Sequence, residues 1–174
     1  MASSMDSSVE AVDALVAALD GLEAVDLSPT LRSAMPRFFA HPEFHLIDDA
    51  RLIDRDRYRL QTLVLPEHVG PHVDAPAHVV AERPEATVDT LDVTALWGRA
   101  VGSDDPTCDM GWVDAEPTAA FGHLEYFLPK DIYILENLEN LGGLPPVVYF
   151  AALPLKIDNG TGSPLRPVAF VPKP

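Results

Sequence analysis

Three of the six histidines of the chain lie within eleven residues, in the segment HVGPHVDAPAH from His68 to His78, together with one aspartate. Imidazole nitrogens and carboxylate oxygens are the ligands that Zn²⁺ takes in proteins, and the carboxylate also suits Mn²⁺. Gly70 and Pro71 interrupt the segment and Pro76 follows, which argues against a helix that presents two histidines four residues apart. The pattern indicates a kinked, extended segment that could bind a divalent metal ion.

The spacing of these side chains predicts that they converge. Residues two apart in an extended strand share a face, so His72 and Asp74 point the same way. The Gly-Pro kink can bring His68 to the same point, and the proline that follows Asp74 can turn the chain so that His78 returns over it. Two imidazoles and one carboxylate leave open positions for water on a metal, as hydrolytic metal sites require. The alternative interpretation is a set of separate histidines on a turn, at the surface or in the core.

This segment also resembles the H-x-G-T-H-x-D-x-P-x-H signature of the cyclase family of metal-dependent hydrolases, which includes bacterial kynurenine formamidase and isatin hydrolase. VDLSPTL resembles the opening strand and turn of the family, and residues 131–169 are similar to its C-terminal block. The resemblance covers most of residues 24–171. It implies an α/β fold, namely one β-rich domain of the swivelling β/β/α type, with a sheet core, few helices and an N-terminal helix outside the core.

The resemblance implies a role for each chemical group of the segment. The first two histidines and the aspartate would bind the metal: His68, His72 and Asp74. The last histidine, His78, would be the proton shuttle. In formamidase-like members a later histidine and glutamate complete a second metal position, which Glu136 matches. The family places that histidine at Leu124 of this chain, and the nearest histidine is His123, which we take as the candidate.

The sequence departs from the family at two places. Pro71 stands where the family usually has threonine, which removes a hydroxyl and a backbone N–H beside the ligands. Between Ala100 and Val101 the family normally has a long section that is missing here. The chain is therefore either a minimal variant or a truncated form whose core a partner chain completes.

The expected activity is that of a metal-dependent hydrolase. It would cleave a C–N bond of an amide, formamide or cyclic amide with a metal-activated water, using one or two Zn²⁺ or Mn²⁺ ions. The alternative is a metal-binding relative that has lost catalysis and serves as a binding or scaffold protein, which the missing section and Pro71 favour. A serine nucleophile lacks its G-x-S-x-G elbow, and Cys108 lies among acids that disfavour a thiolate.

Composition limits the partners. The formal charge is −15, from 27 acids and 12 bases, which argues against nucleic acid because phosphate contacts need clustered cations. The sequence shows neither a membrane-spanning apolar run nor a secretory signal, and one cysteine allows no disulfide within the chain.

We therefore expect a cytoplasmic protein that acts on a small amide-type substrate. An apolar N-terminal helix and the missing section predict a homo-oligomer, dimeric or larger.

Helical periodicity over residues 7–21 predicts a helix that Ser7 or Ser8 caps and Gly21 ends. Its apolar side chains share one face: Val9, Val12, Leu15, Val16, Leu19 and Leu22. Such a face covers a core or a partner subunit more often than it binds a ligand. Residues 1–23 are therefore expected to form a helical arm, and residues 24–174 the hydrolase domain.

Strands are expected where β-branched and aromatic residues alternate or run together. These segments are 23–31, where a short strand runs into a proline turn, and 58–67, 131–138, 147–157 and 165–172. Segment 58–67 is expected to enter the core and to deliver the chain to His68, and segment 147–157 to be a buried strand. Residues 33–56 are expected to be irregular. The aromatic residues that could line a pocket or pack in the core are Phe38, Phe39, Phe44, Trp97 and Trp112.

Overall fold

The computed structural model describes residues 2–48, 60–100 and 122–173. Within these residues the chain forms one α-helix and nine short strands, joined by turns and by short 3-10 and π-helical segments. Their bounds are α1 Ala2–Asp20, β1 Leu22–Asp26, β2 His45–Asp48, β3 Gln61–Val64, β4 His72–Asp74, β5 Trp97–Ala100, β6 Ile134–Glu136, β7 Val148–Ala151, β8 Gly162–Pro164 and β9 Val168–Pro172. Strands therefore form the body of the molecule, as the β-rich fold class predicts.

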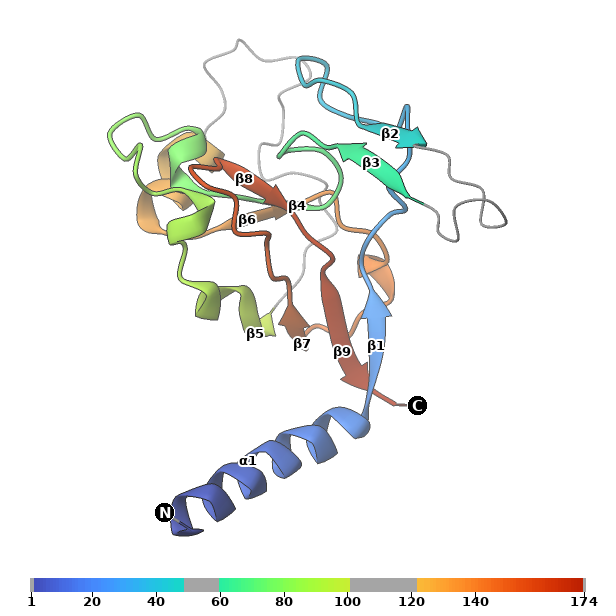
Figure 1. The fold of residues 1–174 in the computed structure, drawn as a ribbon, viewed down its shortest axis with the longest axis vertical. Coiled ribbons are helices and arrows are strands. Elements are labelled where there is room, and N and C mark those ends of the chain that lie inside the picture. Colours follow the sequence, from blue (N-terminus) through green and yellow to red (C-terminus); the bar gives the residue numbers. More distant parts are fainter. Residues whose placement is uncertain (1, 49–59, 101–121, 174) are drawn as a thin grey trace.

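The strands pair antiparallel and form three open sheets (Figure 1). The largest sheet has the order β1-β9-β7-β5, so the first and last strands of the chain are neighbours. β2 and β3 form a separate two-stranded ribbon. The third sheet has the order β6-β4-β8, and its central strand carries part of the segment that the sequence singled out. Strand β4 is therefore held on both sides by segments far away in the sequence.

Alternation along β4 separates the core from the chemically active face. Val73 is fully buried in an apolar cluster with Ala75, Val88 and Leu96. His72 and Asp74 flank Val73 in sequence and therefore point to the opposite face of the strand. Two further buried clusters support the other segments: Leu27, Val148 and Ala169, and Met35, Phe44 and Val69. The apolar anchor of β4 thus fixes which way its two polar side chains point.

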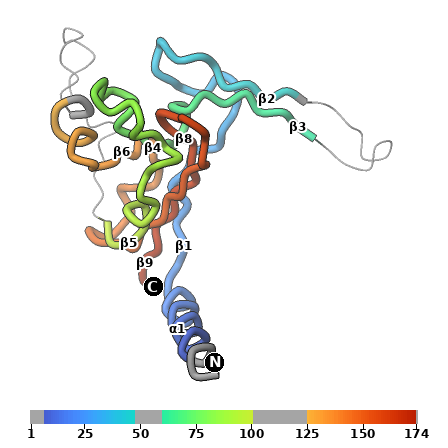
Figure 2. The backbone as a smooth tube through the Cα atoms, turned by 60° about the vertical axis from the view of Figure 1, so that its left-hand side comes forward, coloured from blue at the N-terminus to red at the C-terminus, as the bar shows by residue number. Residues whose placement is uncertain are grey.

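Helix α1 lies outside the core, as predicted, and projects away from the sheets (Figures 1 and 2). It begins at Ala2, so the predicted cap at Ser7 or Ser8 is wrong; the alanine, serine and methionine residues before them extend the helix. It ends at Asp20, directly before Gly21, as predicted. Its apolar stripe is exposed, with Val9, Val12, Leu15 and Val16 between 49% and 58% accessible. No helix among the described residues is long and apolar enough to cross a bilayer.

The strand predictions fail where tertiary packing decides burial. Strand β3 was expected to enter the core, yet all four of its residues are exposed, because it pairs with β2 in the separate ribbon. Strand β2 itself lies in the segment expected to be irregular. In β7 only Val148 is buried, and the other three residues are partly or largely exposed, so the expected buried strand is covered only in part. It ends at Ala151, two residues before a Leu-Pro pair that suits an extended exit.

Candidate metal centre

The three-stranded sheet brings one imidazole and two carboxylates to the same face. His72 and Asp74 lie two residues apart on β4. Glu136 lies on β6 directly opposite His72, because the two strands are paired in that register. Directly opposite residues on antiparallel strands point to the same face of a sheet. His72 Nε2 is consequently 3.3 Å from Asp74 Oδ1 and 3.9 Å from Glu136 Oε2.

The kink before β4 orients the His72 ring. Gly70 has φ +72°, a conformation that glycine adopts without strain, and a Cβ there would also meet the Leu31 side chain. The carbonyl oxygen of Gly70 accepts a hydrogen bond from His72 Nδ1 at 2.8 Å and one from Asn137 Nδ2 at 3.2 Å. Nδ1 of the His72 ring therefore donates to this carbonyl oxygen, and Nε2 faces the two carboxylates.

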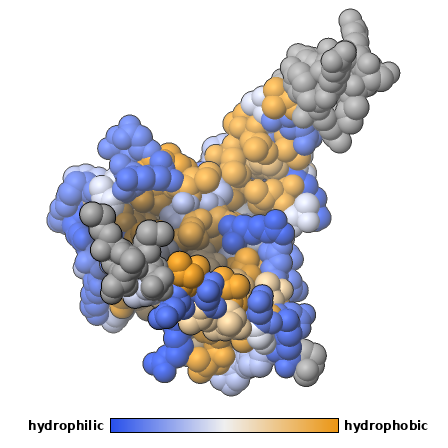
Figure 3. Space-filling view, turned by 60° about the horizontal axis from the view of Figure 1, so that its bottom comes forward, coloured by the Kyte–Doolittle hydropathy of each residue, from blue (hydrophilic) through white to orange (hydrophobic). Residues whose placement is uncertain are grey.

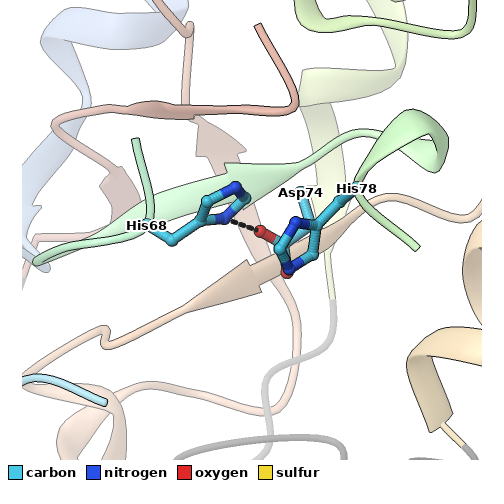
Figure 4. Close-up of side chains that lie close together, drawn as sticks. All are labelled: His68, Asp74 and His78. Atoms are coloured by element: carbon cyan, nitrogen blue, oxygen red, sulfur yellow. Dashed lines mark hydrogen bonds and ion pairs between the residues drawn. The ribbon is translucent and has the colours of Figure 1, made fainter. Parts of the chain in front are cut away.

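His68 reaches the same carboxylate from the other side of the kink. His68 Nδ1 is 2.7 Å from Asp74 Oδ1 (Figure 4). On the other side of the ring, His68 Nε2 is 3.0 Å from Thr161 Oγ1. Its ring lies against Gly162, where a Cβ would come within 3 Å of both ring nitrogens. Gly162 is the register partner of Asp74 on β8. The strand pairing therefore places Gly162, which has no side chain, at the position where the His68 ring packs.

His78 lies over the cluster, as Figure 4 shows. It is the last residue of a 3-10 turn, Pro76–His78, that follows β4 and begins with the proline noted in the sequence. Its ring stacks on that of His68, with centroids 3.9 Å apart and an interplanar angle of 27°. The short turn thus returns the chain over the carboxylate side of the cluster.

Two groups of side chains within the described ranges have ligand atoms that lie within 4.8 Å of one another. One group is His72, Asp74 and Glu136, and the other is His68, Asp74 and His78. The four residues of the sequence segment are therefore gathered at one place, but they are divided between two adjacent positions that share Asp74. Glu136 joins the first group, as its position before Asn137 and Leu138 suggested.

The donor set fits a divalent cation. Two ligand atoms about 2.1 Å from one tetrahedral ion lie roughly 3.4 Å apart. The 3.3 Å between His72 Nε2 and Asp74 Oδ1 meets that distance without movement. The 2.7 Å between His68 Nδ1 and Asp74 Oδ1 is a hydrogen-bond distance, so this pair must open by about 0.7 Å to accept an ion.

The electrostatics of the cluster favour positive charge. Burial disfavours the charged imidazole and lowers the pKa of His72, but the hydrogen bond and charge of Asp74 outweigh this. With smaller contributions from the Gly70 carbonyl and from Glu136, the pKa of His72 rises above its ordinary value of 6.5. Asp74 is only 1% exposed, and a carboxylate so buried needs a cationic or hydrogen-bonding partner. A divalent metal ion bound at this place would supply such a charge.

Some predicted site residues lie outside the described part of the molecule. His123 belongs to the short π-helical segment Gly122–Phe127, but its side chain is not among those described, so its assignment stays a prediction. Cys108 and Trp112 fall in a range that is not described. Trp97 begins β5 and is 43% exposed on the four-stranded sheet, which is a different sheet from that of β4.

Sequence reasoning missed the residues that support the ligands. Glu67 and Thr161 lie next to His68, Gly162 makes room for its ring, and Asn137 holds the Gly70 carbonyl. Glu67 ends the predicted strand segment 58–67, Asn137 lies in the predicted strand segment 131–138, and Thr161 and Gly162 lie between the predicted strand segments 147–157 and 165–172. The available signal was the density of polar and glycine residues in DNGTGSP, which does not say what the turn contacts.

An aromatic wall lies beside the cluster. His41 Nδ1 is 3.3 Å from the His68 carbonyl oxygen, and the two rings have centroids 5.9 Å apart. Phe38 packs edge-on against His41, with a centroid distance of 5.2 Å, and is 40% exposed. The segment that carries both residues therefore supplies flat, partly exposed surfaces near the candidate ligands. Phe44 of the same segment is buried and packs in the core.

The family model named Cyclase, whose description reads “Putative cyclase”, matches residues 25–119, which is more than half of the chain and includes the whole segment from His68 to His78. The chain belongs to the cyclase family. The family prediction is thereby confirmed. A comparison of this cyclase-family protein with curated proteins finds no match.

Several solved structures share the fold of this cyclase-family protein. Isatin hydrolase A from Ralstonia solanacearum is similar with a TM-score of 0.70 at 20% identity, over 92% of this chain and 97% of that one. Isatin hydrolase A from Labrenzia aggregata gives 0.68 at 20% identity, over 94% and 100%. A protein described as a potential metal-dependent hydrolase with cyclase activity gives 0.63 at 15% identity, over 88% and 100%. The predicted sheet-rich fold with few helices is confirmed.

Proposed function

We propose that this cyclase-family protein is a metal-dependent hydrolase that cleaves the C–N bond of an amide, formamide or cyclic amide. The observation that carries the proposal is the position of Asp74, whose Oδ1 lies 2.7 Å from one imidazole nitrogen and 3.3 Å from another. A carboxylate between two imidazoles, with Glu136 beside it, is a donor set for Zn²⁺ or Mn²⁺. The similarity to structures named as hydrolases supports the same class.

His68, His72, Asp74 and Glu136 would hold the metal, with Asp74 common to both positions, and His123 remains a candidate for the second. A divalent ion bound there would activate a water molecule for attack on a carbonyl carbon and would stabilise the charge that develops on the carbonyl oxygen. Asn137 and the Gly70 carbonyl hold His72 in one orientation, so that no ring rotation is needed on binding.

His78 would move the proton. It lies over the shared carboxylate side of the cluster and stacks on His68. A histidine exchanges protons near neutral pH, so His78 can take the proton that water releases and return it to the leaving nitrogen. The same position also makes His78 a candidate ligand, and the two roles differ in what the loss of its ring would do.

A flat carbonyl compound suits the wall that Phe38 and His41 form. Aromatic side chains favour planar rings through stacking and edge contacts. Two of the similar structures are isatin hydrolases, and a further isatin hydrolase is described as bound to the product analogue thioisatinate. We therefore propose isatin-like cyclic amides and aryl formamides as the first substrates to test.

The test is turnover of isatin, N-formylkynurenine and small lactams by protein loaded with Zn²⁺ or with Mn²⁺, beside metal-free protein and an Asp74→Asn variant. We expect hydrolysis of at least one of them by a metal-loaded form, and loss of that activity both in the variant and on removal of the metal. Folded, metal-loaded protein that turns over none of them would favour the alternative, a metal-binding relative that acts as a scaffold.

We further propose that the chain forms a homo-oligomer through α1. The helix has an exposed apolar stripe (Figure 3). It carries acidic residues but no basic residue. A groove of about 280 Å³ on the four-stranded sheet offers Val147, Tyr149 and Phe170 together with the cationic Arg99. Helix α1 of a second copy of the chain would fit this groove. Its apolar stripe suits the apolar lining, and its acidic residues suit Arg99. The helical arm, the missing section after Ala100 and a cytoplasmic location stay predictions.

A further inference from the structure

The peptide group between Gly70 and Pro71 carries the acceptor that orients the His72 ring. Its carbonyl oxygen accepts hydrogen bonds from His72 Nδ1 at 2.8 Å and from Asn137 Nδ2 at 3.2 Å. One donor lies on β4 and the other directly after β6, so two segments depend on the same carbonyl group. Because a peptide group is planar, the direction of this carbonyl is set by the two torsions beside it, ψ of Gly70 and φ of Pro71.

Gly70 by itself would leave this carbonyl free to turn. Glycine has the largest backbone freedom of all residues, and Gly70 uses it to adopt φ +72°. The ring of Pro71 fixes the second torsion at about −65° and also narrows the conformations open to the residue before it. Pro71 is buried, so its ring is held by its surroundings as well. The proline therefore removes one of the two rotations that could carry the carbonyl away from the His72 ring.

The end of β8 holds Pro71 from its other side. Pro71 directly precedes β4, and extending the strand register by one residue places it opposite Leu165 and Asn137. The Leu165 N–H donates to the Pro71 carbonyl oxygen at 3.0 Å. Opposite residues in a hydrogen-bonded antiparallel pair exchange two such bonds, but proline has no N–H with which to form the second. Pairing with β8 therefore ends at Pro71, and β4 begins at His72.

We infer that Pro71 is a positioning residue that holds the Gly70 carbonyl against the His72 ring and the Asn137 side chain. Its carbonyl is bonded to the end of β8, and its ring fixes the torsion that leads back to Gly70. The inference rests on the proposed function only in that a metal ion is the group that the oriented His72 ring serves. The proline that replaces the threonine of the family thus stiffens the segment that carries the candidate ligands.

The substitutions are chosen to act on this carbonyl from its two sides. Pro71→Ala frees the φ torsion and restores an N–H that can bond to Leu165, which would draw the chain toward β8. Asn137→Gly removes the second donor, and glycine keeps the positive φ of +58° at that position without strain. Pro146→Ala is the matched control, because Pro146 is exposed in a loop and its loss gives the unfolded chain the same added freedom.

The first readout is hydrogen exchange, measured by NMR on metal-free, full-length protein at the side-chain amide of Asn137 and the backbone amide of Leu165. In the wild-type protein and in Pro146→Ala, we expect both groups to be protected. In Pro71→Ala we expect the Asn137 amide to lose its protection while Leu165 keeps it, because only the Gly70 carbonyl has moved. Unchanged protection of Asn137 in Pro71→Ala would overturn the inference. Loss of protection at Leu165 as well would also overturn it, because the proline would then only hold the strands together.

The second readout is the affinity for Zn²⁺ and Mn²⁺ alone, measured by titration calorimetry. We expect a loss of about tenfold in Pro71→Ala and in Asn137→Gly, as for other groups that orient a metal-ligating histidine, and no change in Pro146→Ala. Because both substitutions act on one carbonyl, the double variant should lose clearly less than the product of the two single losses. Wild-type affinity in Pro71→Ala, or a double loss equal to that product, would overturn the inference. Wild-type protein that binds neither metal would contradict the proposed function, and the exchange result would still decide the role of Pro71.

Discussion

His72 and Glu136 lie directly opposite each other on the neighbouring antiparallel strands β4 and β6, with His72 Nε2 3.9 Å from Glu136 Oε2. They are 64 positions apart in the sequence, and the strand register is what brings them together. Asp74, two residues further along β4, shares their face. One short sheet therefore presents a complete group of three candidate ligands on elements whose backbones hold each other in place.

Glu136→Gln tests whether this glutamate is a ligand. The substitution keeps the shape but removes the negative charge, so we expect at least a tenfold loss of affinity for the ion near His72, measured by calorimetry together with metal content. Glu139→Gln is the matched control, because Glu139 is an exposed glutamate three residues further on. Equal loss in both variants would point to a general effect of charge instead of ligation.

Gly162→Ala tests the seat of His68. The added methyl group would lie within 3 Å of both ring nitrogens, so the ring must move away from Asp74. We expect metal affinity to fall by about tenfold or more, as for other losses of ligand orientation. Gly143→Ala, at a site where a Cβ meets nothing within 4 Å, should bind metal as the wild-type protein does. Circular dichroism would verify that both variants keep their secondary structure, and wild-type affinity in Gly162→Ala would contradict the geometry.

His78→Ala distinguishes a proton shuttle from a ligand. If His78 moves protons, kcat should fall by about 10²- to 10⁴-fold while the bound metal per chain stays constant. His78 also belongs to the group with His68 and Asp74, so it could be a ligand instead. In that case the bound metal per chain should fall. Steady-state kinetics and elemental analysis of the same preparation measure both quantities. Unchanged kcat with unchanged metal would remove His78 from both roles.

The ion pair between Asp26 and Arg166 predicts how stability depends on acidity. Arg166 Nη2 donates to Asp26 Oδ2 at 2.6 Å, and the Ser28 N–H donates to Asp26 Oδ1 at 3.0 Å. The hydrogen bond from Arg166, and after it that from Ser28, lowers the pKa of Asp26 below its ordinary 3.8. Because the folded pKa is the lower one, the stabilisation is complete above pH 3.8 and is lost as the pH falls through the folded pKa.

The measurement is urea unfolding of the wild-type protein and Asp26→Asn between pH 7 and pH 3. We expect the variant to be less stable at pH 7, and the difference to shrink toward the acid end and with added salt, since the pair is exposed. Asp20→Asn serves as a control, as an exposed aspartate at the end of α1. A difference that stays constant across this range would show that the pair does not act through charge.

Leu15→Glu tests the proposed contact of α1 with a second copy of the chain. Leu15 is 55% exposed on the apolar stripe, so a charge there should lower the mass measured by light scattering toward that of one chain. Ala17→Glu adds the same charge on the face that carries Asp13 and Glu10, and it should leave the mass unchanged. Monomeric wild-type protein at micromolar concentrations would contradict the proposal directly.

The sequence predicted which side chains lie together better than it predicted the residues that contact them. The types and spacing of His68, His72 and Asp74 indicated a convergent cluster, because a two-residue period and a Gly-Pro kink are local properties of the backbone. The contacts of Thr161 and Gly162 with His68 depend on which strands pair, a tertiary outcome that no local pattern encodes. The same holds for β3, whose alternating residues suggested burial although its only described partner is β2.

Strand β4 carries Val73 into an apolar cluster and its two neighbours into the polar one. A slip of one residue against β6 or β8 would turn an imidazole and a carboxylate into hydrocarbon and would expose the valine. Such a misaligned sheet would forfeit apolar burial and strand an ionised group away from water at the same time. Apolar burial and the polar side chains thus favour the same alignment of this three-residue strand, so the candidate metal site and the interior of the protein depend on one strand register.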